Sequence, residues 1–267
     1  MADAFFEPHG DGFAPTVLTR GPWDPDAQHA GPPAALLGRA IERVGAEDAD
    51  ADAPPAVVGR VTYEILRSVP IAPLTVSTQV LRPGRRVELV EARLSDGDGE
   101  VMRATAWRLR PKPVEMPAGL PRREAPPGPE AGREGDFFPT GQEVGYHTAM
   151  EYRFVAGAFL DPGPATVWMR MRHPLVAGEA PSALQRVLVA ADSGNGVSAT
   201  LDWRRYLFIN VDLTVQLHRV PEGEWVCLDA VTIPEPTGVG LADTALHDER
   251  GPIGRATQTL LVATRDG

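Results

Sequence analysis

The stretch from Ser182 to Gly196 constrains the fold more than any other part of the chain. Its apolar residues recur at helical spacing, at Leu184, Val187, Leu188 and Ala191. Val189 and Ala190 make the same helix apolar on nearly every side, so we expect the rest of the protein to enclose it. Ser182 precedes the first turn, where its hydroxyl can accept a backbone N–H. The chain must therefore supply enough sheet and helix to surround this segment.

Asp192 stands at the end of this helix and is followed by Ser-Gly-Asn-Gly, a sequence that favours helix termination. A carboxylate at the end of a buried helix is costly unless it is hydrogen-bonded or used in the protein's function. Two interpretations stay open from the residues alone. Asp192 either bonds the turn that follows the helix or takes part in a reaction.

Composition excludes several classes of partner. The 267 residues carry a formal net charge of −10, which disfavours nucleic acid and anionic membranes as partners. The single cysteine, Cys227, excludes an intramolecular disulfide and a cysteine-based zinc site, and the six scattered histidines predict no metal site. The N-terminus shows no basic region followed by an apolar run, so we expect a cytoplasmic protein.

The second half of the chain repeats the first. A helix is expected from the Pro-Pro pair at 32–33 to Val44, and strands at 57–69, 74–82, 86–94 and 101–109. In the second half, strands are expected at 152–159, 165–172, 197–203, 207–218, 225–233, 239–248 and 253–262. We therefore predict an α+β fold with an N-terminal unit at 1–115, a linker rich in proline, glycine and charge at 116–145, and a C-terminal unit at 146–267.

This arrangement resembles the double hotdog fold of the TesB-type acyl-CoA thioesterase family. Three segments carry the resemblance: Val-Ala-Ala-Asp192, the strand from Asn210 to Arg219, and the closing strand Gly251 to Thr259. The resemblance implies two tandem hotdog units, each with one central helix wrapped by a curved antiparallel sheet. It also implies a hydrolase of fatty acid metabolism that needs no cofactor, since coenzyme A is part of the substrate.

In that family an aspartate, a hydroxyl residue and a glutamine bind and activate the water that attacks the thioester. Carried over by position, the aspartate is Asp192 and the hydroxyl position is Asn210, while the glutamine position falls on Thr259 with Gln258 one residue early. One residue of offset turns a strand side chain to the other face. Either a bulge brings Gln258 inward, or Thr259 is the third member. Each residue also has a non-catalytic interpretation. Asn210 would only satisfy a strand edge, and Thr259 would be an ordinary strand residue.

Residues that flank the two helices are the expected substrate contacts. They are His29, Gly31, Ser193 and Asn195. Backbone N–H groups near Ala30–Gly31 or Ser182–Ala183 are candidate donors to the oxyanion. We predict a thioesterase in which Asp192 is the general base, acting on acyl-CoA or acyl-pantetheine.

Two other functions stay open. One is a non-catalytic protein that binds acyl groups, because two of the three family positions differ. The other is an enoyl-CoA hydratase that uses Asp24 and His29, whose spacing is similar to the Asp/His pair of hotdog hydratases. Exposed sheet edges predict a homodimer or a larger assembly.

Overall fold

The computed structural model describes residues 2–45, 55–120 and 124–265. Its helices are η1 (Val17–Thr19), α1 (Gly31–Arg43), η2 (Pro129–Ala131), α2 (Tyr146–Ala149), α3 (Ala183–Ala191) and α4 (Gly194–Val197). Its strands are β1 (Phe6–His9), β2 (Gly12–Pro15), β3 (Val57–Ile65), β4 (Thr75–Arg82), β5 (Val87–Asp96), β6 (Gly99–Leu109), β7 (Met150–Ala158), β8 (Asp161–Met171), β9 (Tyr206–Asn210), β10 (Asp212–Leu217), β11 (Val226–Pro234), β12 (Val239–Asp248) and β13 (Gly251–Thr264). None of the helices in these ranges is long and apolar enough to cross a membrane.

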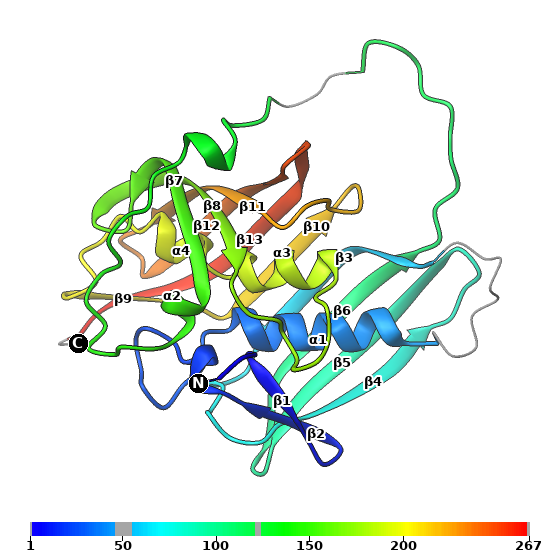
Figure 1. The fold of residues 1–267 in the computed structure, drawn as a ribbon, viewed down its shortest axis with the longest axis horizontal. Coiled ribbons are helices and arrows are strands. Elements are labelled where there is room, and N and C mark those ends of the chain that lie inside the picture. The colour runs from blue at the N-terminus through cyan, green and yellow to red at the C-terminus, as the bar shows by residue number, and fades with distance from the viewer. Residues whose placement is uncertain (1, 46–54, 121–123, 266–267) are drawn as a thin grey trace.

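One antiparallel sheet of eleven strands joins the two halves of the chain (Figure 1). Its order is β4-β5-β6-β3-β10-β13-β12-β11-β8-β7, and β9 pairs with β13 beside this path. The halves meet where β3 pairs with β10, with Thr62 opposite Thr214. β1 and β2 form a separate hairpin near the start of the chain. The α+β class expected from the sequence is therefore present.

Helices α1 and α3 pack against each other in antiparallel directions. His29, just before α1, lies beside Asp192, just after α3. At the opposite ends, Ser182 before α3 donates its hydroxyl to Glu42 of α1 at 2.7 Å. Arg39 and Arg43 of α1 close this second end through ion pairs with Glu179. The helix pair therefore has one end held by side-chain contacts and another end that contains Asp192.

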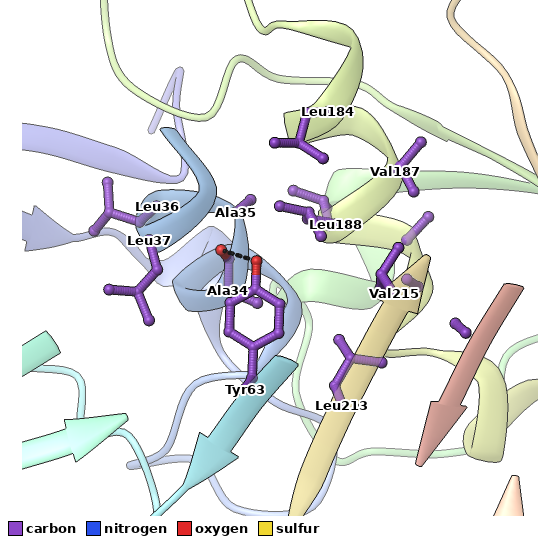
Figure 2. Close-up of a cluster of buried hydrophobic side chains, with 14 of the residues drawn as sticks. Ala34, Ala35, Leu36, Leu37, Tyr63, Leu184, Val187, Leu188, Leu213 and Val215 are labelled. Atoms are coloured by element: carbon purple, nitrogen blue, oxygen red, sulfur yellow. Dashed lines mark hydrogen bonds between the residues drawn. The ribbon is translucent and has the colours of Figure 1, made fainter. Parts of the chain in front are cut away.

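Close packing explains why α3 is apolar on most sides. Figure 2 shows residues of α1, α3, β3 and β10 meeting in one buried cluster: Ala34, Ala35, Leu36, Leu37, Tyr63, Leu184, Val187, Leu188, Leu213 and Val215. The Tyr63 hydroxyl donates to the Ala34 carbonyl at 3.0 Å, so its one polar atom is satisfied inside this cluster. Gly31 allows the two helices to approach, because a Cβ there would overlap the carbonyl oxygen of Val189.

The start of α3 agrees with the sequence, but the segment after it does not. Ser182 accepts the Gln185 N–H at 3.1 Å, as an N-cap residue does. The expected turn and strand at 197–203 are instead the short helix α4 followed by a loop. Neither Gly194 nor Gly196 adopts a positive φ, so the chain continues as helix. The Ser198 hydroxyl then stabilises α4 by donating to the Gly194 carbonyl at 2.8 Å.

Part of the segment between the two halves packs onto the second half. The Trp168 indole N–H donates to the Pro127 carbonyl at 2.8 Å. Arg133 forms an isolated β-bridge with Phe154. Phe138 is buried and stacks on Trp23 with ring centroids 4.7 Å apart. These contacts bring residues of the expected linker against the second half, and Phe138 in addition reaches Trp23, which lines the cavity described next.

Candidate active site

A cavity of about 480 Å³ lies where the start of α1 meets the end of α3. Its polar lining includes His29, Asp192, Asn195 and Asn210. Its apolar and aromatic lining includes Trp23, Ile65, Val69, Leu207, Phe208 and Val211. Arg67 and Arg265 contribute positive charge. A largely apolar pocket with a few convergent polar groups is the usual form of a small-molecule site.

Asp192 is the best-connected polar residue of this cavity. It is only 5% exposed, and its two carboxylate oxygens have different surroundings. Oδ1 accepts from Asn210 Nδ2 at 2.9 Å and from Gln258 Nε2 at 3.3 Å. Oδ2 lies 3.0 Å from Nδ1 of His29. The carboxylate is thus held by two amides on one side and faces an imidazole on the other.

Gln258 and Thr259 lie on opposite faces of β13, so only one of them can reach the site. Gln258 is buried, and its Nε2 donates to both the main-chain and side-chain oxygens of Asp192. Its Oε1 accepts the Asn195 N–H at 3.0 Å, which fixes the orientation of the amide. Thr259 is on the outer face, where its hydroxyl donates to Asp212 at 3.2 Å. The structure therefore does not bring Thr259 to the site, because strand alternation directs its side chain outward.

Asn210 reaches Asp192 because the strand is interrupted at Val211. The expected continuous strand at 207–218 is divided into β9 and β10 on either side of this residue. The Val211 N–H donates to the Thr259 carbonyl at 3.1 Å, so the chain stays attached to β13 across the break. Asn210 lines the cavity and donates to Asp192, so it does more than satisfy a strand edge.

His29 is fixed from two sides. Its ring stacks on Tyr146 with centroids 3.7 Å apart and an interplanar angle of 12°. The Gly31 N–H donates to Nδ1 at 3.1 Å. Burial lowers the pKa of His29, and the nearby Asp192 carboxylate offsets only part of this effect. His29 is therefore a neutral imidazole near pH 7.

The other expected substrate contacts divide into two kinds. Asn195 lines the cavity, and its side-chain amide donates to the Phe208 carbonyl at 3.4 Å. Ser193 is buried behind the cavity, with its hydroxyl 3.0 Å from the Tyr146 hydroxyl. Gly31 likewise acts on His29 through its N–H and is not part of the cavity wall. Ser193 and Gly31 thus support the site, whereas Asn195 borders it.

Asp24 does not pair with His29. Its carboxylate accepts the Asp26 N–H at 2.9 Å in an exposed turn, and the imidazole contacts Asp192 instead. Asp24 and His29 thus border the same cavity, but no hydrogen bond or ion pair joins these two described side chains. Among the residues that the structure describes, no group of three or more His, Cys, Asp or Glu side chains is placed to hold a metal ion.

Both halves of the chain match models of one protein family. The model of the acyl-CoA thioesterase N-terminal domain matches residues 19–109, and that of the C-terminal domain matches residues 121–262. The chain belongs to the acyl-CoA thioesterase family. Among curated proteins, none matches its sequence.

Solved structures agree with the family's fold. A protein described as a thioesterase II from Thermobifida fusca YX has a TM-score of 0.69 at 20% identity, over 89% of this chain and 87% of that chain. A hot dog fold protein of unknown function from Alicyclobacillus acidocaldarius has a TM-score of 0.68 at 16% identity, over 98% and 97%. The tesB protein of Mycobacterium avium subspecies paratuberculosis has a TM-score of 0.63 at 16% identity, over 97% and 95%. The protein is thus a double hotdog.

Sequence reasoning missed one residue of this candidate site. Tyr146 supports the ring of His29, and its hydroxyl donates to the Val189 carbonyl at 2.7 Å. Burial raises the pKa of this hydroxyl well above its usual value, so it stays protonated. Tyr146 follows a segment without strand or helix periodicity, and only the folded chain brings it to the start of α1.

Proposed function

We propose that the protein hydrolyses acyl-CoA thioesters with a water molecule that Asp192 activates. The observation that supports this most is the position of the Asp192 carboxylate, which borders the cavity while amides hold one of its oxygens. Such a group can orient a water molecule and accept its proton. Hydrogen bonds to a charged acceptor contribute about 1.5–3 kcal/mol each, which offsets the cost of burying it.

In the family pattern, Asn210 takes the place of the hydroxyl residue, and Gln258 supplies the glutamine. Asn210 lines the cavity and can hold both the carboxylate and the attacking water. Gln258 is 1% exposed, so its role is to orient Asp192 from behind. The third position of the family pattern is thus assigned to Gln258 and not to Thr259.

Ala30 is the candidate donor to the oxyanion that forms when water attacks. It lines the cavity at the start of α1, and no acceptor for its N–H occurs within the described ranges. Pro32 and Pro33 carry no N–H, and the Gly31 N–H is used by His29. At the other expected place, Ser182 lies at the far end of the helix pair. An oxyanion donor of this kind can lower the barrier by about 3 kcal/mol.

The cavity lining suits a thioester of coenzyme A. Apolar side chains such as Ile65, Val69 and Phe208 can receive an acyl chain. Arg67 and Arg265 can attract the phosphate groups of the carrier. Arg67 is also ion-paired with Asp96, and Asp24 lies on the same cavity wall, so the charge available to an anionic substrate comes mainly from Arg265.

Release of free thiol from acyl-CoA esters of increasing chain length tests the proposal. The wild-type protein is expected to release thiol, and Asp192→Asn is expected to lose about 100-fold or more in kcat. This substitution keeps an oxygen that can accept from Asn210. Asp212→Asn, on the outer face beside Thr259, is the matched control and should leave kcat unchanged. Tight binding of acyl-CoA without turnover would instead show a non-catalytic acyl-binding protein.

A further inference from the structure

The Gly31 N–H determines which nitrogen of His29 carries a proton. A backbone N–H can only donate, so Nδ1 at 3.1 Å must accept and is unprotonated. Since burial lowers the pKa of His29 and the ring is neutral near pH 7, its single proton is on Nε2. The backbone at the start of α1 thus selects one tautomer.

The Nε2–H is available to a molecule in the cavity. His29 lines that cavity and its side chain is 13% exposed. Nothing within residues 2–45, 55–120 and 124–265 accepts a hydrogen bond from Nε2, whereas Nδ1 has contacts on the protein side. Stacking on Tyr146 keeps the ring in this orientation. A proton donor therefore borders the space in which the thioester would lie.

Asp192 Oδ2 and His29 Nδ1 lie 3.0 Å apart. They can form a hydrogen bond only when one of these two atoms carries a proton. In the resting state both atoms present lone pairs to each other. Once Asp192 has taken a proton from water, Oδ2–H can donate to Nδ1, which makes Asp192 a better base. The pair is thus arranged for the state that follows attack by water.

We propose that His29 relays the proton of the attacking water from Asp192 to the leaving thiolate, a role that rests on the proposed thioester hydrolysis. Water forms a bond to the carbonyl carbon, gives its proton to Oδ2, and the carbonyl π pair moves to the oxygen. Oδ2 passes the proton to Nδ1. The C–S bond then breaks with its electron pair on sulfur, the oxyanion pair restores the carbonyl, and Nε2 gives its proton to sulfur.

The cycle closes without any further reactant. The carboxylic acid product returns a proton to Nε2, and the proton on Nδ1 leaves to solvent through Asp192. The net products are a carboxylate, a free thiol and one proton. His29 comes from the first half of the chain and Asp192 from the second, so the relay crosses between the two repeats.

The dependence of turnover on the leaving thiol tests this relay. His29→Gln keeps a side-chain N–H at the position of Nε2 but cannot carry a proton across. With an acyl-CoA, whose alkyl thiolate is a poor leaving group unless it gains a proton, this variant should lose about 100-fold or more in kcat. With the 4-nitrothiophenyl ester of the same acid, whose thiolate leaves without a proton, the loss in kcat should be at least about 10-fold smaller.

Asp192→Asn separates this result from a failure of the proposed function. It should lose turnover of both esters, and if it keeps both, the proposed hydrolysis by Asp192 fails. If Asp192→Asn loses both esters while His29→Gln loses both equally or neither, hydrolysis stands and the relay is overturned. Two further measurements, on the wild-type protein and on His29→Ala, test the relay. Nitrogen-15 shifts of wild-type His29 should show the proton on Nε2, and imidazole should restore turnover of the acyl-CoA to His29→Ala.

Discussion

Replacing Gly31 by alanine tests whether the close approach of α1 and α3 sets the geometry of the site. A Cβ at residue 31 would lie under 3.0 Å from the carbonyl oxygen of Val189, whereas ordinary contacts begin at 3.4 Å. The helices must therefore separate by more than 0.4 Å, and backbone cannot give way as a flexible side chain can. Overpacking of this kind costs about 1–3 kcal/mol, which corresponds to a fall in Tm of roughly 2–10 °C.

The same displacement should reach the chemistry, because His29 precedes α1 and Asp192 follows α3. His29 Nδ1 and Asp192 Oδ2 are 3.0 Å apart, so a small increase in this distance takes them out of hydrogen-bond range. Urea unfolding and thiol release from acyl-CoA, measured on the same samples, should both fall for Gly31→Ala. Gly196→Ala is the matched control, since nothing lies within 4 Å of a Cβ there. Unchanged stability and unchanged kcat in Gly31→Ala would refute the reasoning.

Two further predictions concern the supporting residues. Gln258→Ala leaves the Asn195 N–H and the Asp192 main-chain carbonyl without a partner and removes one of the two amide donors to the Asp192 carboxylate. It should lower the free energy of unfolding by about 1–3 kcal/mol, whereas Thr259→Ala should lower it by less than about 1 kcal/mol; equal losses in urea unfolding would contradict this placement. Below about pH 6.5 the unfolded chain protonates His29 while the folded chain, with its lowered pKa, does not, so stability should fall by up to about 1.4 kcal/mol per pH unit. His29→Gln removes this contribution, and the two stability curves should converge as the pH falls towards the folded pKa; parallel curves would exclude it.

Much of the fold could be predicted because its signals are local. The apolar spacing of α3, the Ser182 cap and the alternation along the strands specify elements before any tertiary contact exists. The strand expected at 197–203 was wrong for a physical reason. Gly194 and Gly196 favour helix termination in sequence, but a Ser198 hydroxyl bond and a buried Val197 support another helical turn.

The site was less predictable because it depends on register and on long-range packing. A motif comparison leaves Gln258 and Thr259 one residue apart, and only the pairing of β12 with β13 shows that Gln258 faces inward. The contact between His29 and Asp192 joins residues 163 positions apart in the chain, so no local pattern encodes it. The residues next to Tyr146 in the sequence form no motif that would mark it as part of the site.

The unequal ends of the α1–α3 pair make the two repeats non-interchangeable. At one end the first repeat contributes an imidazole and the second a carboxylate, while at the other end Glu42 and Ser182 bond each other. A chain assembled from two copies of the first repeat would carry His29 twice and lack Asp192, and one assembled from two copies of the second would have the reverse defect. Fusion of the halves into one polypeptide guarantees that each molecule receives one of each.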